Sequence, residues 1–268
     1  MLNKKIVFIG GGNMSEGIIR GIINNKVLVP GNIYVYDVLD ERIEYLHNTY
    51  GIVSILNVEE SVRKADIIII AVRPQDFNQV VVLIKGNTSN GQIIISICAG
   101  INVAKMANFI GNEHKFARIM PNTMVEAQHG YSGVCVNDKI ANEDKEIIST
   151  LFNCLGQTMF INEVLFDEFT AFSCAGPAYV LYFIAAMIDA GVQSGFSRKD
   201  STAITIENII GSAMMVQMTG KHPYQITDTM TSPAGVTITG CHVLSKTGFH
   251  GIVMDAVESA VKRTRELG

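Results

Sequence analysis

Two patterns of hydrophobic residues alternate along the first part of the chain, up to Phe160. One is a short apolar run rich in isoleucine and valine, which is typical of a parallel strand buried on both faces. Such runs predict strands at Lys5–Ile9, Ile33–Tyr36, Ile52–Ile55, Ile67–Ala71, Ile93–Ile97, Phe116–Ile119, Ser132–Val136 and Thr158–Ile161. The other is a longer stretch with helical periodicity, which predicts helices that include Glu41–Tyr50, Val58–Lys64, Phe77–Lys85 and Asn142–Cys154. This alternation predicts an α/β fold with a doubly wound sheet.

Beyond Phe160 the helical pattern continues without intervening strands. We predict helices at Glu168–Ala171, Pro177–Ser194, Lys199–Thr219, near Val236–Ser245 and at Phe249–Leu267. The change of pattern predicts two domains with a boundary near Asn162, an α/β domain over residues 1–162 and an all-helical domain over residues 163–268. Within the second domain, three methionines at helical spacing are predicted to be core residues: Met214, Met215 and Met218.

One segment of the predicted helical domain, Ala171–Ile188, carries no charge and is as long as a membrane-spanning helix. Gly176 and Pro177 interrupt it, and Glu168 and Asp189 flank it closely, so we interpret it as a buried helix and predict no membrane partner. A helix that is apolar on nearly all faces must be covered on nearly all faces. In a chain of this size a second copy is the natural cover, which predicts a homodimer or a higher homo-oligomer.

A glycine-rich turn, Gly10–Ser15, follows the first predicted strand and has the spacing G-x-G-x-x-S. Gly10 permits a tight turn, Gly12 lets a diphosphate approach the backbone, and Ser15 is small enough for a helix to pack closely on the strand. The start of that helix offers unpaired N–H groups to phosphate. Asp37, after the second predicted strand, would accept a hydrogen bond from a ribose hydroxyl. A glycine turn without a ligand is the alternative, but this context predicts a dinucleotide-binding domain of Rossmann type.

Three further loops follow predicted strands, at the sheet edge where ligands bind in such folds. In Ala71–Gln75 a proline, Pro74, ends the strand and holds the turn. In Ser96–Gly100 small residues leave room for a ring, and in Arg118–Thr123 Asn122 is placed to fix a turn or to orient an amide. Each loop alone is equally consistent with an ordinary connection.

The segment Met230–Gly240 contains a helix-start signal, Ser232-Pro233, in which serine caps the helix and proline lies in its first turn. Ala234 and Gly235 allow close approach to the backbone. Thr237 then offers a hydroxyl near free N–H groups, which is a natural site for a small carboxylate. The alternative is that Ser232 and Thr237 only cap the helix.

Composition and charge narrow the possible functions. The net charge is −4 and the basic residues are scattered, so we predict no nucleic-acid partner. The five cysteines include no C-x-x-C pair, which predicts reduced thiols in a cytoplasmic protein. The six histidines lack the spacing of metal ligands, so we predict no metal. The chain leads straight into a strand, so no signal peptide is expected.

Over its whole length the chain resembles the pyrroline-5-carboxylate reductase family. The resemblance rests on these motifs in this order: Gly10–Ser15, Val72–Gln75, Arg118–Thr123, Gly176–Tyr179, Ser232–Ile238 and Arg263–Leu267. It implies a Rossmann-type domain, a helical C-terminal domain that interlocks two subunits, and the reduction of 1-pyrroline-5-carboxylate to L-proline by NAD(P)H, the final step of proline biosynthesis. It also implies that Thr237 contacts the substrate near its nitrogen.

The sequence departs from the family pattern at three places. The family usually has glycine where Ala234 stands, commonly has serine where Ala175 stands, and often has glutamate where Ser245 stands. These changes leave two alternatives open: a reductase of a related cyclic imine, and a non-catalytic, nucleotide-sensing paralogue. The presence of Thr237 and Asn122 favours an enzyme.

The predicted catalytic residue is Thr237. The predicted substrate-binding residues are Ser232, Ala234, Gly235, Val236, Thr237, Asn122 and Ala175. The predicted cofactor-binding residues are Gly10, Gly11, Gly12, Asn13, Met14, Asp37, Asn57, Ala71, Val72, Arg73, Pro74, Cys98, Ala99 and Gly100. We expect both NADPH and NADH to bind, with a preference for NADH because Asp37 repels a 2′-phosphate, although Arg42 is close enough in sequence to compensate.

Overall fold

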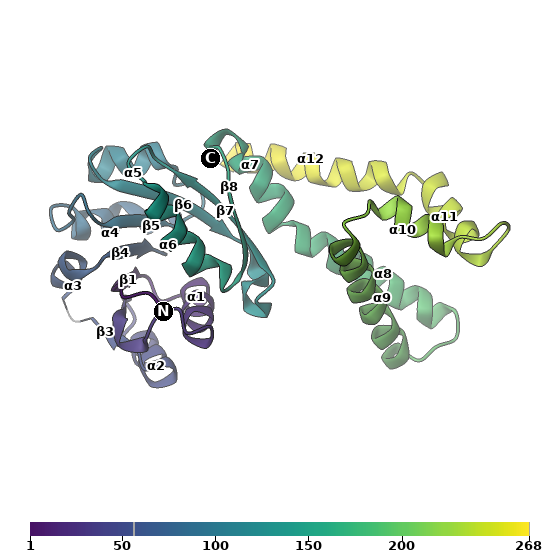
Figure 1. The fold of residues 1–268 in the computed structure, drawn as a ribbon, viewed down its shortest axis with the longest axis horizontal. Coiled ribbons are helices and arrows are strands. Elements are labelled where there is room, and N and C mark those ends of the chain that lie inside the picture. The colour runs from purple at the N-terminus through teal and green to yellow at the C-terminus, as the bar shows by residue number, and fades with distance from the viewer. Residues whose placement is uncertain (56, 268) are drawn as a thin grey trace. The chain divides into compact units, whose positions relative to one another are not determined.

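The computed structural model describes residues 1–55 and 57–267, and its N-terminal part is built on one eight-stranded sheet (Figure 1). The strands are β1 (Ile6–Ile9), β2 (Ile33–Tyr36), β3 (Val53–Ser54), β4 (Ile67–Ile70), β5 (Ile93–Ser96), β6 (Lys115–Pro121), β7 (Gly130–Val136) and β8 (Gly156–Phe160). All eight predicted strands are confirmed, with ends that agree to within two residues.

The strand order places a topological switch point beside the first strand. The order is β3-β2-β1-β4-β5-β6-β7-β8, so the chain builds outward from β1 in one direction and then from β4 in the other. All neighbouring strands are parallel except β6 and β7, which are antiparallel and joined by a 3₁₀ helix at Thr123–Ala127. Ligands of such sheets bind where the order reverses, outside the carboxyl ends of β1 and β4.

Helices cover both faces of the sheet, which confirms the doubly wound α/β prediction. Ile6 and Phe8 share one hydrophobic core with α1 (Asn13–Asn24), α2 (Asp40–Tyr50) and α6 (Asn142–Asn153). Val7 and Ile9 share the other with α3 (Val58–Lys64), α4 (Phe77–Ile84) and α5 (Val103–Ile110). Alternate residues of a strand point to opposite faces, so the continuous isoleucine runs are buried on both sides.

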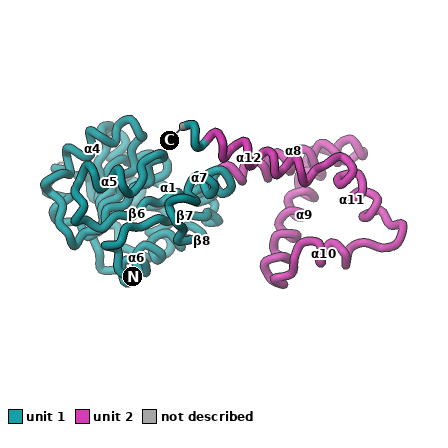
Figure 2. Tube along the Cα trace, turned by 90° about the horizontal axis from the view of Figure 1, so that it is seen from above, with its two compact units in different colours: residues 1–174, 264–268 teal, residues 175–263 magenta. Residues whose placement is uncertain are grey.

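The chain divides into two compact units (Figure 2). The first unit runs from Met1 to Cys174 and includes α7 (Phe166–Phe169), the π-helix Thr170–Cys174 and the end of α12 from Thr264 onward. The second unit consists of helices: α8 (Gly176–Gln193), α9 (Arg198–Thr219), α10 (Pro223–Met230), α11 (Val236–Lys246) and most of α12 (Phe249–Leu267). The domain boundary near Asn162 stays a prediction.

The helices of the second unit leave much of their apolar surface uncovered in the single chain. Every residue of α8 is described, and none is buried. By length and composition alone, Glu163–Gln193 could cross a membrane, with a mean hydropathy of 1.7 in a window of which 6% is buried. The predicted burial of the three methionines is wrong for one chain, because Met214, Met215 and Met218 are 50%, 41% and 75% exposed.

Candidate active site

The glycine turn has the geometry of a diphosphate cradle. Gly10 has a φ of +104°, and a Cβ there would lie 2.5 Å from the Ala71 carbonyl oxygen, so only glycine fits. Gly12 precedes α1 without a side-chain cap, and a Cβ there would meet nothing within 4 Å. The buried Ser15 hydroxyl donates to the Gly10 carbonyl at 2.6 Å and holds the turn against the helix. An open backbone before uncapped N–H groups is what a diphosphate requires.

Asp37 follows β2 and faces this turn. Its Oδ2 accepts from the Gly11 N–H at 2.7 Å, and its Oδ1 accepts from the Leu39 N–H at 3.1 Å. Each oxygen keeps a lone pair for a further donor. Asp37 therefore fits the predicted contact with a ribose hydroxyl.

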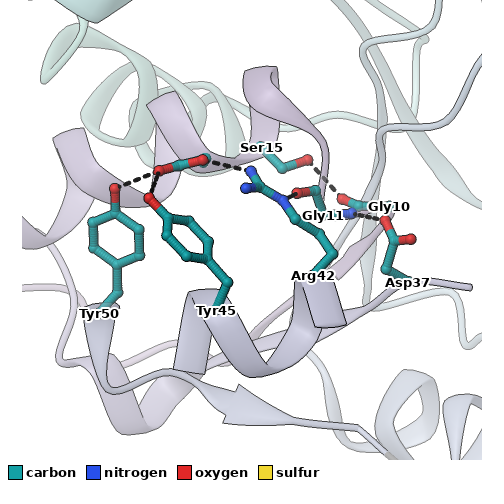
Figure 3. A network of polar contacts seen from close by, with 8 residues as sticks. Gly10, Gly11, Ser15, Asp37, Arg42, Tyr45 and Tyr50 are labelled. Atoms are coloured by element: carbon teal, nitrogen blue, oxygen red, sulfur yellow. Dashed lines mark hydrogen bonds and ion pairs between the residues drawn. The ribbon is translucent and has the colours of Figure 1, made fainter. Parts of the chain in front are cut away.

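A polar network that the sequence analysis did not identify lies beside Asp37 (Figure 3). Arg42, on α2, donates from Nε to the Gly11 carbonyl and from Nη2 to Glu16 Oε2, each at 2.5 Å. The hydroxyls of Tyr45 and Tyr50 donate to Glu16 Oε1 at 3.0 and 2.8 Å. Glu16 lies on α1, so the network joins the first two helices and the glycine turn.

The contacts within this network shift the pKa values of Glu16 and Tyr50. Burial acts to raise the pKa of Glu16, but hydrogen bonds from Arg42, Tyr50 and Tyr45 outweigh it, and the pKa lies below its ordinary value of 4.5. Burial, followed by the hydrogen bond to Glu16, raises the pKa of the Tyr50 hydroxyl. Glu16 is therefore ionised at neutral pH and paired with Arg42.

The other predicted cofactor residues follow neighbouring strands of the first unit. Ala71–Pro74 follow β4, and the Ala71 N–H donates to the Ile9 carbonyl at 2.8 Å, so this loop adjoins the glycine turn. Cys98–Gly100 follow β5, and Asn57 follows β3, where its Oδ1 caps α3 by accepting from a backbone N–H at 2.9 Å. The structure thus brings the predicted cofactor residues to one edge of the sheet.

The thiol of Cys98 is enclosed within the first unit. It is buried, and its Sγ lies 3.5 Å from the Ile70 carbonyl oxygen. Burial raises the pKa of this thiol. The loop therefore offers its backbone, with the left-handed Gly100 (φ +71°), and not a reactive cysteine.

The side chain of Asn122 makes its hydrogen bonds within the first unit. Its Oδ1 accepts from the Met124 and Tyr131 N–H groups at 3.2 and 3.3 Å, and its Nδ2 donates to the Ser173 carbonyl at 3.1 Å. The residue is 7% exposed. Of its two predicted roles, this geometry supports fixing the turn, and its part in substrate binding stays a prediction.

The predicted substrate segment of the second unit forms a turn before α11. The Gly235 N–H donates to the Ser232 carbonyl at 3.0 Å, and Ala234 between them has a φ of +57°. The prediction that Ser232 caps the helix with Pro233 in its first turn is wrong, because the left-handed Ala234 delays the helix until Val236.

The first turn of α11 has polar groups without partners. Gly235 is its N-cap and supplies no side-chain hydrogen bond. The Thr237 hydroxyl makes no hydrogen bond with any residue that the structure describes, whereas the Thr239 hydroxyl donates to the Gly235 carbonyl at 2.9 Å. Ala175, the remaining predicted substrate residue, precedes α8 and likewise gives no side-chain cap. Free N–H groups and a free hydroxyl suit a small anion.

Together, the sheet with its switch point and the open glycine turn define a dinucleotide-binding protein of Rossmann type. A family model described as "NADP oxidoreductase coenzyme F420-dependent" matches residues 5–100, and one described as "Pyrroline-5-carboxylate reductase dimerisation" matches residues 163–267. The second match implies that the chain forms homo-oligomers.

Relatives of similar length give the particular family. The pyrroline-5-carboxylate reductase of Arabidopsis thaliana is 36% identical over 98% of this chain and 95% of its own length. That of Escherichia coli is 34% identical over 99% of both chains. A crystal structure of the Plasmodium falciparum pyrroline carboxylate reductase with NADP bound has a TM-score of 0.87 at 34% identity and covers 100% of this chain and 99% of that one. The chain belongs to the pyrroline-5-carboxylate reductase family.

Proposed function

We propose that this chain reduces 1-pyrroline-5-carboxylate to L-proline with NADPH or NADH, the final step of proline biosynthesis and thus a step of amino-acid biosynthesis. The observation that supports the proposal is the start of α11, where the helix has no side-chain cap and the Thr237 hydroxyl is unpaired among the described residues. Such groups suit a small carboxylate. This site occurs in a chain that also has an open dinucleotide cradle.

In the first unit, the glycine turn and the start of α1 would hold the diphosphate, and Asp37 would accept a hydrogen bond from the adenosine ribose. The loops after β4 and β5 would flank the nicotinamide. The cofactor, when bound, supplies the hydride. The protein's part is to fix the geometry of transfer and to exclude water.

In the second unit, the N–H groups at the start of α11 bind the substrate carboxylate. The Thr237 hydroxyl donates a hydrogen bond to the lone pair that develops on the substrate nitrogen as the hydride adds to the imine carbon. A protonated imine is already electrophilic, so positioning supplies most of the acceleration. The imine carbon gains a hydride, the C=N bond becomes a single bond, and the nitrogen keeps its proton as an amine. Neither a metal nor a nucleic acid has a part in this reaction.

The active form is a homodimer, or a larger assembly of dimers, joined through the C-terminal helices. The apolar surfaces of α8, α9 and α11 that are exposed in one chain support this assembly, with a second copy rather than a membrane covering them. We also infer a cytoplasmic enzyme, with a dinucleotide-binding domain over residues 1–162 and a substrate-binding and dimerisation domain over residues 163–268.

The test is a substrate panel. Initial rates of NADH and NADPH oxidation are measured with 1-pyrroline-5-carboxylate, its six-membered homologue and an isomer with the carboxylate on the imine carbon. We expect kcat/KM to be highest for 1-pyrroline-5-carboxylate by at least about tenfold, a difference of about 1.4 kcal/mol in transition-state binding. A higher kcat/KM for another imine would identify that imine as the substrate. Cofactor binding without turnover of any imine would support a nucleotide sensor.

A further inference from the structure

Glu16 and Arg42 form an ion pair beside the glycine turn that Asp37 contacts. In Rossmann-type folds this region contacts the adenosine ribose of a bound dinucleotide. Arg42 belongs to the helix that follows Asp37, where an arginine can accommodate a 2′-phosphate. Here its guanidinium points back to α1 and the glycine turn, as Figure 3 shows. The pair is largely buried, with 23% of the Arg42 side chain and 16% of the Glu16 side chain exposed.

Glu16 holds Arg42 firmly. Both oxygens of the carboxylate accept hydrogen bonds, one from Arg42 and the other from two tyrosine hydroxyls on α2. Arg42 also donates to the Gly11 carbonyl and lies 5.1 Å from the centre of the Tyr45 ring. Charge-assisted hydrogen bonds between partly buried groups are among the stronger ones in proteins, so moving Arg42 to a new partner breaks favourable contacts.

The other charged residues that line the hollow beside Arg42 are negative. The hollow beside it, about 580 Å³ in volume, is lined by Val38, Leu39, Asp40, Glu41, Arg42 and Tyr45, with Arg42 as the one cation in that lining. Asp37 adds a third carboxylate next to the glycine turn. A 2′-phosphate would therefore enter a negative field in which the nearest cation is already neutralised.

We propose that Glu16 determines the choice of nicotinamide cofactor: by holding Arg42 against α1, it withholds the cation that a 2′-phosphate needs. The chain therefore prefers NADH to NADPH. The inference rests on the proposed function, since it concerns the same cofactor site. Glu16 is a specificity-determining residue that acts through Arg42 and touches no reacting atom.

The test measures the binding of NAD⁺ and NADP⁺ by calorimetry without substrate, so that turnover has no part in the readout. In Glu16→Gln the freed Arg42 can turn to the phosphate, and the affinity for NADP⁺ relative to NAD⁺ should rise about tenfold, the effect of one charge-assisted hydrogen bond. Glu44→Gln is the matched control, because Glu44 is an exposed glutamate on α2, the helix of Arg42, and has no charged partner among the described residues. Its affinity ratio should equal that of the wild type.

A second variant keeps the test decisive if Glu16→Gln folds poorly. Arg42→Gln in the wild-type background should change the affinity ratio less than about threefold, because Arg42 does not yet serve the phosphate, and should cancel the gain in Glu16→Gln. A tenfold loss of NADP⁺ affinity in Arg42→Gln alone, or an unchanged ratio in a folded Glu16→Gln, would overturn the proposal. If the wild type binds neither dinucleotide, it is the proposed function that fails.

Discussion

At the scale of single residues, Thr237 carries the most specific prediction. Its hydroxyl is unpaired within the described structure and lies in the first turn of α11. Thr237→Val keeps the shape of the side chain and removes the hydrogen-bond donor. If the hydroxyl binds the substrate nitrogen in the transition state, kcat should fall roughly 100-fold while cofactor affinity stays unchanged. Steady-state kinetics and dinucleotide binding measure the two effects.

Thr239→Val is the control for that variant, because it removes a hydroxyl two residues along the same helix that donates to the Gly235 carbonyl. It should lower stability by about 0.5–1.5 kcal/mol and leave kcat within a few fold of the wild type. Near-normal kcat/KM in Thr237→Val would assign Thr237 to structure alone and leave the backbone N–H groups as the substrate site.

Glu16 should make folding stability depend on pH. Its pKa is lower in the folded chain than its ordinary value of 4.5, so its contribution is present above pH 4.5 and is lost as the pH falls through the folded-state pKa. Glu16→Gln should therefore be less stable than the wild type at pH 7 by about 1–2 kcal/mol, and this difference should shrink toward pH 3. Thermal midpoints at equal protein concentration test this, and a difference independent of pH would contradict it.

The residues of the glycine turn could be predicted from the sequence, because the steric requirements of the turn fix small residues at a short, recognisable spacing. The sequence analysis placed Arg42 near the ribose but missed Glu16, Tyr45 and Tyr50. These residues come from two helices, α1 and α2, and meet only because both pack on the same face of the sheet. No local pattern encodes such a meeting.

At the scale of elements, the turn before α11 contains a strained residue. Ala234 has a φ of +57°, a conformation that costs a non-glycine residue about 1–2 kcal/mol. Ala234→Gly removes this strain but adds freedom to the unfolded chain, worth about 0.4–1 kcal/mol in the opposite direction. We expect a net stabilisation of about 0.5–1 kcal/mol, seen as a higher thermal midpoint.

The control for this variant is Ala104→Gly, in the right-handed backbone of α5, which should lower stability by up to about 1 kcal/mol. A lower midpoint in Ala234→Gly as well would show that the turn is not strained. The sequence placed α11 correctly but not its cap, because Ser-Pro is a start signal for a helix and also a frequent opening of a turn. The left-handed conformation of Ala234 makes this segment a turn, and the helix begins only at Val236.

At the scale of the whole molecule, the apolar surface of the second unit predicts that the fold depends on assembly. Leu181 on α8 is 59% exposed in the single chain. Leu181→Asp would place a charge in the proposed subunit interface and should give monomeric or insoluble protein. Leu181 is a better choice than Phe183, whose ring also packs on Phe249 of the same chain at 5.9 Å between centroids.

Val82→Asp is the matched control, since Val82 is an apolar residue 75% exposed on α4 of the first unit. It should keep the wild-type oligomeric state. Analytical ultracentrifugation distinguishes the variants, and a folded Leu181→Asp with the wild-type sedimentation would contradict assembly through α8.

The alternation of strands and helices was enough to predict the doubly wound sheet, because burial on two faces leaves a strong compositional signal. The helical spacing of Met214, Met215 and Met218 predicts a buried surface. Such a pattern cannot indicate whether the same chain or a second copy covers that surface. Met218 is 75% exposed in one chain, and the proposed assembly would account for its apolar character.

The central claim is hydride transfer to the imine carbon of 1-pyrroline-5-carboxylate. The most direct test incubates the protein with this substrate and with NADH carrying two deuterium atoms at C4 of the nicotinamide, then analyses the product by mass spectrometry and NMR. We expect L-proline with one deuterium, on the ring carbon bonded to nitrogen and remote from the carboxylate. Unlabelled proline, or no proline while NADH stays reduced, would contradict it.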